Sequence, residues 1–165
     1  MLQRLERTDI MVNWLILLTL ICLDLVSKHI AFTLLALGQK INLFSILSLC
    51  LAKNYGLGFG LGQGFTKLIT IFNVLILNIF IWMFHKSDHK SSNKTILLLI
   101  LAGGLGNLFD RMVLGFVRDF MLISWHEWSW PIFNLADVYI TLAFLLVLFQ
   151  RPSCELPAMN KRASN

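Results

Sequence analysis

Hydrophobic residues are gathered in four long runs along the chain, and shorter polar segments separate them. The runs cover approximately residues 12–30, 65–84, 95–112 and 130–149. Each run approaches or exceeds the length of about 20 apolar residues that a helix needs to cross a bilayer. The pattern therefore predicts an all-α membrane protein with four transmembrane helices in a single domain over residues 1–150, followed by a polar tail over 151–165.

The segments between the runs indicate extended structure outside the bilayer. Residues 41–54 (INLFSILSLCLAKN) are typical of extended chain, and glycines then alternate with other residues from Gly56 to Gly64, through Gly58. A glycine at every second position would strip one face of a strand, so that a ligand or helix could approach the backbone. A phosphate-binding loop would instead need a βαβ unit. We expect a small sheet on the outer leaflet, beside a tryptophan-rich stretch over 124–131 that is typical of the membrane interface.

Composition narrows the classes of protein further. Of the 165 residues, 57% are hydrophobic and 14% are charged, whereas a soluble domain has about 45–50% apolar and about 25% charged residues. This composition excludes a single-domain soluble protein and a disordered chain. The net charge is +5, but the basic residues form no run and no basic helix face. Basic segments on the cytoplasmic side of membrane helices explain this charge better than nucleic-acid binding does. The three cysteines, Cys22, Cys50 and Cys154, form no disulfide framework or zinc pattern.

Lysines in the loop between the second and third runs predict the orientation. Lys86, Lys90 and Lys94 lie in the short segment 85–94, and short cytoplasmic loops are enriched in basic residues. The amino and carboxyl termini, including the tail, are then cytoplasmic. A removable signal peptide is disfavoured for the first run, because no small-x-small cleavage site follows it and Asp24 interrupts it.

Aspartates are the polar residues of greatest interest, because charge in a membrane is costly and usually functional. Asp24 is followed by Ser27 and Lys28, at i+3 and i+4 on one helix face. This cluster predicts either a structural ion pair or a catalytic carboxylate. Asn54, before the glycines, is either a turn residue or a functional one.

The segment GGLGNLFDR (103–111) carries a second cluster. On a helix, Gly103, Asn107, Asp110 and Arg111 lie on one side. Gly103 allows another helix to come close. Asn107 and Arg111 present hydrogen-bond donors, and we expect Asp110 to hold Arg111. Helix packing with a terminal ion pair is the alternative.

Two further aspartates, Asp119 in GFVRDF and Asp137 in FNLADVYI, approach the same outer end from different elements. Asn134 precedes Asp137 by one turn, and Ala136 leaves space beside it. Two adjacent carboxylates do not both ionise easily. One could activate water while the other polarises an amide carbonyl and protonates the leaving nitrogen. This arrangement suits a metal-free aspartic peptidase; ion pairing and proton relay are the alternatives.

Three other classes fit less well. A proton-coupled transporter would place its aspartates near the midplane, usually within an internal repeat, and the sequence has none. A membrane assembly factor would explain the glycines but not two converging carboxylates. A metallopeptidase would need an HExxH-like pair of histidines, which is missing here.

The ordered motifs DLVSK, NYGLGFG, GGLGNLFDR, VRDF and FNLADVYI, which extend from residue 24 to residue 140, resemble the lipoprotein signal peptidase (signal peptidase II) family. The resemblance implies an aspartic endopeptidase of the bacterial plasma (inner) membrane with an outward-facing site. It implies four spans, a small sheet and an interfacial helix. Such enzymes cut prolipoproteins just before a cysteine that carries diacylglycerol.

The resemblance also assigns roles to individual residues. It implies Asp119 and Asp137 as the catalytic pair and no cofactor or metal. The remaining motif positions fall into a substrate-binding or supporting group and a structural polar group. The first group is Asn54, Gly56, Gly103, Asn107, Arg111, Asn134 and Ala136, and the second is Asp24, Lys28 and Asp110. Gly58 stands where the family usually has alanine, which loosens the loop without removing a chemical group.

Partners follow from the same resemblance. They are diacylglyceryl prolipoproteins, membrane lipid, and inhibitors of the globomycin type, a cyclic depsipeptide. We expect a monomer that binds no nucleic acid.

Overall fold

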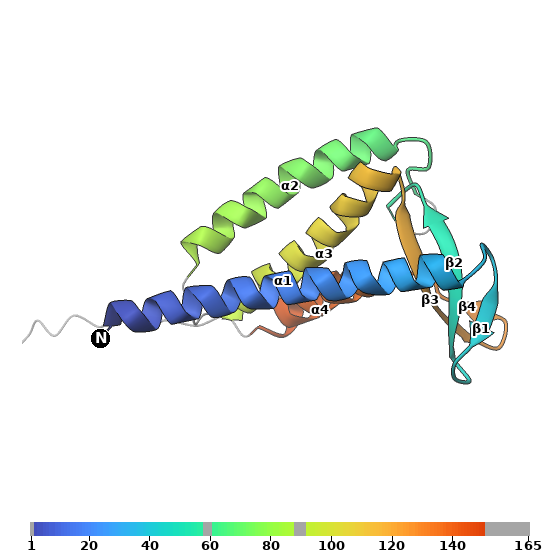
Figure 1. Ribbon diagram of the computed structural model, residues 1–165, viewed down its shortest axis with the longest axis horizontal. Helices are drawn as coiled ribbons and strands as arrows, with labels where there is room; N and C mark the ends of the chain where they lie inside the picture. Colours follow the sequence, from blue (N-terminus) through green and yellow to red (C-terminus); the bar gives the residue numbers. More distant parts are fainter. Residues whose placement is uncertain (1, 58–60, 88–91, 151–165) are drawn as a thin grey trace, which may run out of the picture.

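The part of the chain that the structure describes forms four helices, with a small sheet at one end of them (Figure 1). The computed structural model describes residues 2–57, 61–87 and 92–150. Its helices are α1 (Leu2–Leu34), α2 (Thr66–Lys86), α3 (Ser92–Leu114) and α4 (Leu135–Phe149). The expectations for the tail over 151–165, with Cys154, and for Gly58 concern positions outside the described residues.

Three of these helices are long and apolar enough to cross a membrane: Thr8–Leu34, Thr66–Lys86 and Asn93–Leu114. Helix α4 is also apolar but has 15 residues, a length of about 22 Å against a hydrocarbon core of about 30 Å. Among the described residues, three of the four expected spans have helices of spanning length, and the fourth stays a prediction because α4 is shorter. The chain is a multi-pass membrane protein.

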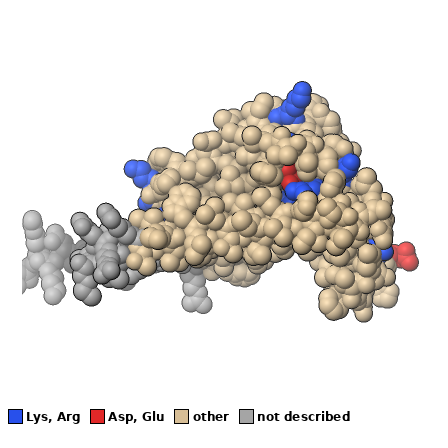
Figure 2. Space-filling model, in the orientation of Figure 1, with Lys and Arg blue, Asp and Glu red and all other residues tan. Residues whose placement is uncertain are grey.

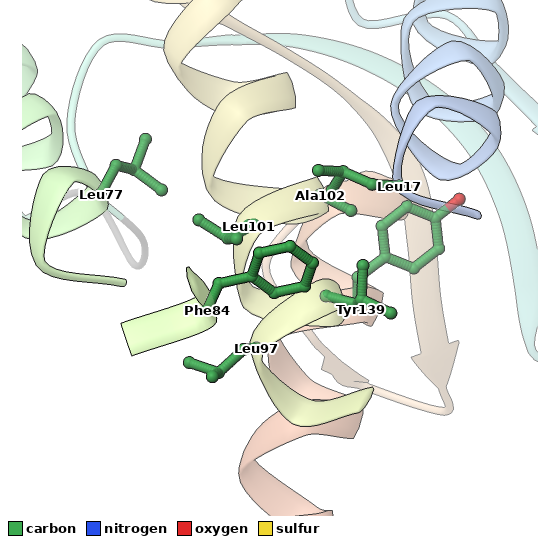
Figure 3. Packing of buried hydrophobic residues seen from close by; sticks show 8 residues of the cluster. Leu17, Leu77, Phe84, Leu97, Leu101, Ala102 and Tyr139 are labelled. Carbon is green, nitrogen blue, oxygen red and sulfur yellow. The ribbon is translucent and has the colours of Figure 1, made fainter. Parts of the chain in front are cut away.

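Helix α3 lies at the centre of the bundle, and α1, α2 and α4 all pack against it. Among the described residues, no Cα of α2 lies within 8 Å of a Cα of α4. The shared core includes Leu17 of α1, Leu77 of α2, Leu101 and Ala102 of α3, and Tyr139 of α4 (Figure 3). The outer faces of α1, α2 and α4 expose large apolar side chains, and Figure 2 shows few charged groups on the face in view. These faces suit contact with lipid.

The predicted small sheet is present and antiparallel. It contains β1 (Lys40–Asn42), β2 (Leu47–Asn54), β3 (Val117–Trp125) and β4 (Trp128–Ser129), in that order. The tryptophan-rich stretch forms the β3–β4 hairpin, and the described residues contain no separate interfacial helix. In the central strand pair, Ala52 lies opposite Asp119. The sheet therefore brings the end of β2 beside the buried beginning of β3.

The expectation of a glycine-stripped strand was wrong for the glycines that the structure describes. Strand β2 ends at Asn54, and Gly62 and Gly64 lie in a turn with φ angles of 74° and 90°. Glycine adopts this left-handed region without the steric cost that a side chain brings. These two glycines therefore reverse the chain so that it can enter α2.

Candidate active site

Asp119 lies in the buried first half of β3, where its side chain is only 2% exposed. Two asparagines donate hydrogen bonds to its carboxylate. Asn134 Nδ2 is 2.6 Å from Asp119 Oδ1, and Asn54 Nδ2 is 2.9 Å from Oδ2. Both oxygens of a buried carboxyl group thus have neutral partners, which hold it in one orientation.

Asp137 lies in the first turn of α4 and forms a capping box with Asn134. The Asp137 N–H donates to Asn134 Oδ1, and the Asn134 N–H donates to Asp137 Oδ2, each over 3.1 Å. A carboxylate is also favoured at this end of a helix by the helix dipole. The third contact is from Asn107 Nδ2 to Asp137 Oδ1, over 2.9 Å. Asp119 and Asp137 are therefore both hydrogen-bonded to Asn134.

The contacts of the amide oxygens fix the orientation of all three asparagines. Asn107 Oδ1 accepts from Lys28 Nζ over 2.9 Å, and Asn54 Oδ1 accepts from the Gly56 N–H over 2.9 Å. Asn134 Oδ1 accepts from the Asp137 N–H. Because an ammonium and backbone N–H groups only donate, each amide must turn its nitrogen toward an aspartate.

Next to the asparagines, Asp24 and Lys28 form the ion pair that their i, i+4 spacing predicts. The Nζ–Oδ2 distance is 2.7 Å, and both side chains are fully buried. Asp24 Oδ1 also accepts from the Ala136 N–H over 2.9 Å, so that α1 caps the start of α4. Lys28 in turn bonds Asn107. The pair thus connects three helices beneath the two aspartates.

The expected contact between Asp110 and Arg111 was wrong. Asp110 holds Arg118, which donates from Nη2 to Oδ1 over 2.6 Å and from Nε to Oδ2 over 3.1 Å. Successive side chains of a helix point in directions about 100° apart, so Arg111 faces elsewhere. It donates to the Gly56 carbonyl over 2.9 Å and to the Asn107 carbonyl over 3.4 Å.

Two glycines of α3 allow the helices to approach closely. A Cβ at Gly103 would collide with the Ala136 carbonyl oxygen, and one at Gly106 would collide with the Asp24 carboxylate. Gly103 was expected to allow close packing, whereas Gly106 was not singled out from the sequence. Its signal was its place within the GGLGN segment, one turn after Gly103.

Burial raises the pKa of Asp119 from 3.8 to about 7. The negative charge of Asp137 raises this pKa further, while the hydrogen bonds from Asn134 and Asn54 lower it. Asp119 therefore holds a proton at a pH where an ordinary carboxyl group has lost its own. No cluster of three His, Cys, Asp or Glu side chains suited to a metal ion occurs in the part of the chain that the structure describes.

Two cavities reach Asp137 from different sides. One, of about 320 Å³, is mostly apolar and is lined by Trp128, Trp130 and Phe133, among others. The other, of about 450 Å³, lies between α2, α3 and α4 and includes Asn107 and Arg111 in its walls. An aspartate with a raised pKa beside a second one at the junction of two cavities is typical of an enzyme site.

Comparison with known proteins places the chain in a family. The profile described as signal peptidase (SPase) II matches residues 16–151. The chain belongs to the signal peptidase II family. It is 30% identical over 142 residues to the lipoprotein signal peptidase of Wigglesworthia glossinidia brevipalpis, which covers 83% of this chain and 92% of that protein. With the lipoprotein signal peptidase of Citrobacter koseri the identity is 35% over 144 residues, covering 83% and 87%.

Solved structures with the same fold are membrane enzymes. Two structures described as bacterial membrane enzymes superpose with TM-scores of 0.77 and 0.75, each at 27% identity and over 83% of this chain. They are covered over 85% and 90% of their own lengths. The protein is thus a membrane peptidase of lipoprotein processing. Membership of the signal peptidase II family gives it prolipoproteins as substrates.

Proposed function

We propose that the protein is an aspartic endopeptidase that removes the signal peptide of diacylglyceryl-modified prolipoproteins, cutting just before the lipidated cysteine. The observation that carries the proposal is the placement of Asp119 and Asp137 on the two sides of Asn134. Asn54 and Asn107 complete the hydrogen bonding of the two carboxyl groups.

The pair divides the chemistry between its members. Asp119, with its pKa of about 7, is protonated and donates a hydrogen bond to the scissile carbonyl oxygen. Asp137 is the general base that takes a proton from the attacking water. The water oxygen forms a bond to the carbonyl carbon, and the resulting tetrahedral intermediate then collapses. Asp119 transfers its proton to the leaving amine nitrogen, which breaks the C–N bond and releases the signal peptide from the lipidated cysteine. The pair again holds one proton, the one that Asp137 took from the water.

The supporting residues act through these two. Lys28 fixes the amide of Asn107, and Asp24 fixes both Lys28 and the start of α4. Arg111 holds the carbonyl of Gly56 next to the site. Ala136 is fully buried and, with Gly103, allows α3 and α4 to meet closely. Asp110 anchors the strand that carries Asp119 through Arg118.

The orientation completes the proposal. In a bacterial plasma membrane with both termini in the cytoplasm, the sheet and the two aspartates lie at the outer face. A diacylated substrate then enters sideways from the outer leaflet, and the mostly apolar cavity beside Trp130 suits the lipid part. An inhibitor of the globomycin type would occupy the same site and exclude the substrate.

The test is cleavage of a diacylglyceryl-modified prolipoprotein by the purified protein. We expect the D119N and D137N variants to lose at least about 100-fold in rate, the usual scale for a lost general acid or base. E127Q is the matched control, because Glu127 is an exposed carboxylate on the turn between β3 and β4. Activity retained in either aspartate variant would exclude that residue from the pair. Loss of activity with a chelator would overturn the metal-free mechanism, and equal cleavage of unmodified precursor would overturn the lipid requirement.

A further inference from the structure

Asn73 places an amide in the middle of the apolar helix α2, on the side that faces the larger cavity at Asp137. The residues of α2 that line this cavity are Ile69, Phe72, Asn73 and Ile76. Their spacing of i, i+3, i+4 and i+7 is that of one helix face. Asn73 therefore belongs to a continuous stripe of α2 that forms one wall of the cavity.

The amide of Asn73 has no hydrogen-bond partner within the described residues, and its side chain is half-buried. Asn78, one and a half turns further along α2, differs. It is exposed, and its Nδ2 donates to the Val74 carbonyl over 2.8 Å. A polar group in an apolar environment is costly unless it is paired. The position of Asn73 in a cavity wall leaves its amide accessible to a ligand.

The opposite wall of the cavity comes from α3 and α4 and is polar at its outer end. Gly104, Asn107 and Arg111 follow one another along α3, and Asp137 and Ile140 belong to α4. From Gly104 to Arg111 the helix rises about 10 Å, which gives the cavity room for about three extended residues. Arg111 Nε is buried and has no partner among the described residues. Among the described residues, no Cα of α2 lies within 8 Å of a Cα of α4, so the cavity lies between two helices that are set apart.

We propose that Asn73 is a substrate-positioning residue, whose amide pairs with one peptide group of the extended signal-peptide segment preceding the scissile bond. This inference rests on the proposed function. An extended peptide within the membrane needs partners for its N–H and C=O groups, and the asparagine amide offers both an acceptor and a donor. The ester groups of a diacylglyceryl moiety offer only acceptors. The peptide is therefore the better match for this wall, and the apolar cavity beside Trp130 is left for the acyl chains.

The first test compares two variants of α2 with the parent protein. N73L removes the amide that faces the cavity, and N78L removes an exposed amide from the same helix. We expect N73L to raise KM for the lipidated prolipoprotein about 5- to 10-fold, which corresponds to the loss of about one hydrogen bond, with kcat within about twofold of the parent. N78L should leave both constants unchanged. Thermal unfolding of both variants shows whether a change in KM reflects misfolding, because a destabilised fold would lower kcat as well.

The second test uses the substrate. Each of the three peptide bonds before the cleavage site is replaced in turn by an ester, which removes its N–H group. At one position the ester should raise KM for the parent but add no further loss in N73L, because the same pair has already been removed. A substrate whose lipid ester groups are replaced by ethers is the comparison. If it raises KM for the parent but adds no further loss in N73L, Asn73 binds the lipid and the proposal is overturned.

The outcomes separate this inference from the proposed function. If the parent cleaves the lipidated substrate and N73L behaves like N78L, the role of Asn73 is wrong while the peptidase activity stands. If the parent does not cleave it, both are wrong. A fall in kcat for N73L, with KM unchanged, would also contradict a positioning role in substrate binding.

Discussion

Asn134 donates its side-chain amide to Asp119 over 2.6 Å, although the two residues lie on different elements, the start of α4 and β3. The same residue is the N-cap of α4, since its Oδ1 accepts from the Asp137 N–H. One asparagine thus fixes the distance between the helix that carries Asp137 and the strand that carries Asp119. Its substitution should separate the capping role from the role at the site.

For Asn134 we predict that serine keeps the helix cap but loses the contact to Asp119. N134S should therefore reduce cleavage about tenfold or more, because the hydroxyl cannot reach the carboxyl group. N134A should be as inactive and also less stable than N134S by about 0.5–2 kcal/mol, the usual value of an N-cap. The measurements are cleavage rate and thermal unfolding in detergent. Full activity in N134S would show that the contact to Asp119 has no catalytic effect.

Asp119 should make both activity and stability depend on pH around neutrality. Its pKa in the fold, about 7, is above the unfolded value of 3.8. Between these values the folded protein holds a proton that the unfolded chain has lost, so stability falls as the pH rises from about 4 to about 7 and then levels off. Cleavage that needs this proton should fall as the pH rises above about 7.

Two variants test this assignment through stability, without any need for activity. D119N removes the titrating group and should give a flatter dependence of the unfolding temperature on pH. D137N removes a negative charge that raises the Asp119 pKa, and should move the remaining dependence to lower pH. An unchanged profile in D119N would show that another group is responsible.

We predict that the Asp110–Arg118 pair stabilises the fold and that its loss also slows cleavage. Asp110 is fully buried and Arg118 nearly so, and removing one member of a buried pair costs about 3–5 kcal/mol. D110A should therefore unfold at lower temperature and, because Arg118 precedes Asp119 on β3, should also cleave more slowly.

A double variant tests whether the unpaired charge is the cause. D110A combined with R118M removes both charges and should recover much of the unfolding temperature that D110A loses. R111K, at the position next to Asp110, should lower the unfolding temperature less than D110A does. If the second substitution lowers the unfolding temperature further, the cost of D110A does not come from the unpaired Arg118.

Gly103 and Gly104 are adjacent on α3 but should tolerate alanine very differently. A Cβ at Gly103 meets the backbone carbonyl of Ala136, whereas one at Gly104 meets Leu77 Cδ2 at 2.6 Å, the flexible end of a side chain. G103A should push α4 and Asp137 away and reduce cleavage more than tenfold, since small displacements of reacting groups are costly. G104A should remain within about threefold of the parent, because a leucine can change its rotamer. Equal rates would show that α4 adjusts without moving the site.

The chain pattern alone predicted the apolar helices, the small sheet and the Asp24–Lys28 pair. These depend on the length of apolar runs or on contacts within one helix, where spacing determines which side chains meet. The five motifs likewise indicate the family, because their order along the chain is a property of the sequence.

Only the tertiary structure determined the long-range partners. Asp110 lies beside Arg111 in sequence, yet it pairs with Arg118, because the chain turns at Gly115 and brings β3 back against α3. The link from Asn54 through Asp119 and Asn134 to Asp137 joins two strands and a helix, and no periodicity encodes it. Asn73 is a polar residue in an apolar run, but its cavity is formed only by the packing of α2 and α4 against α3. Sequence spacing determines neighbours along one element, whereas packing between elements determines which buried polar groups must satisfy one another.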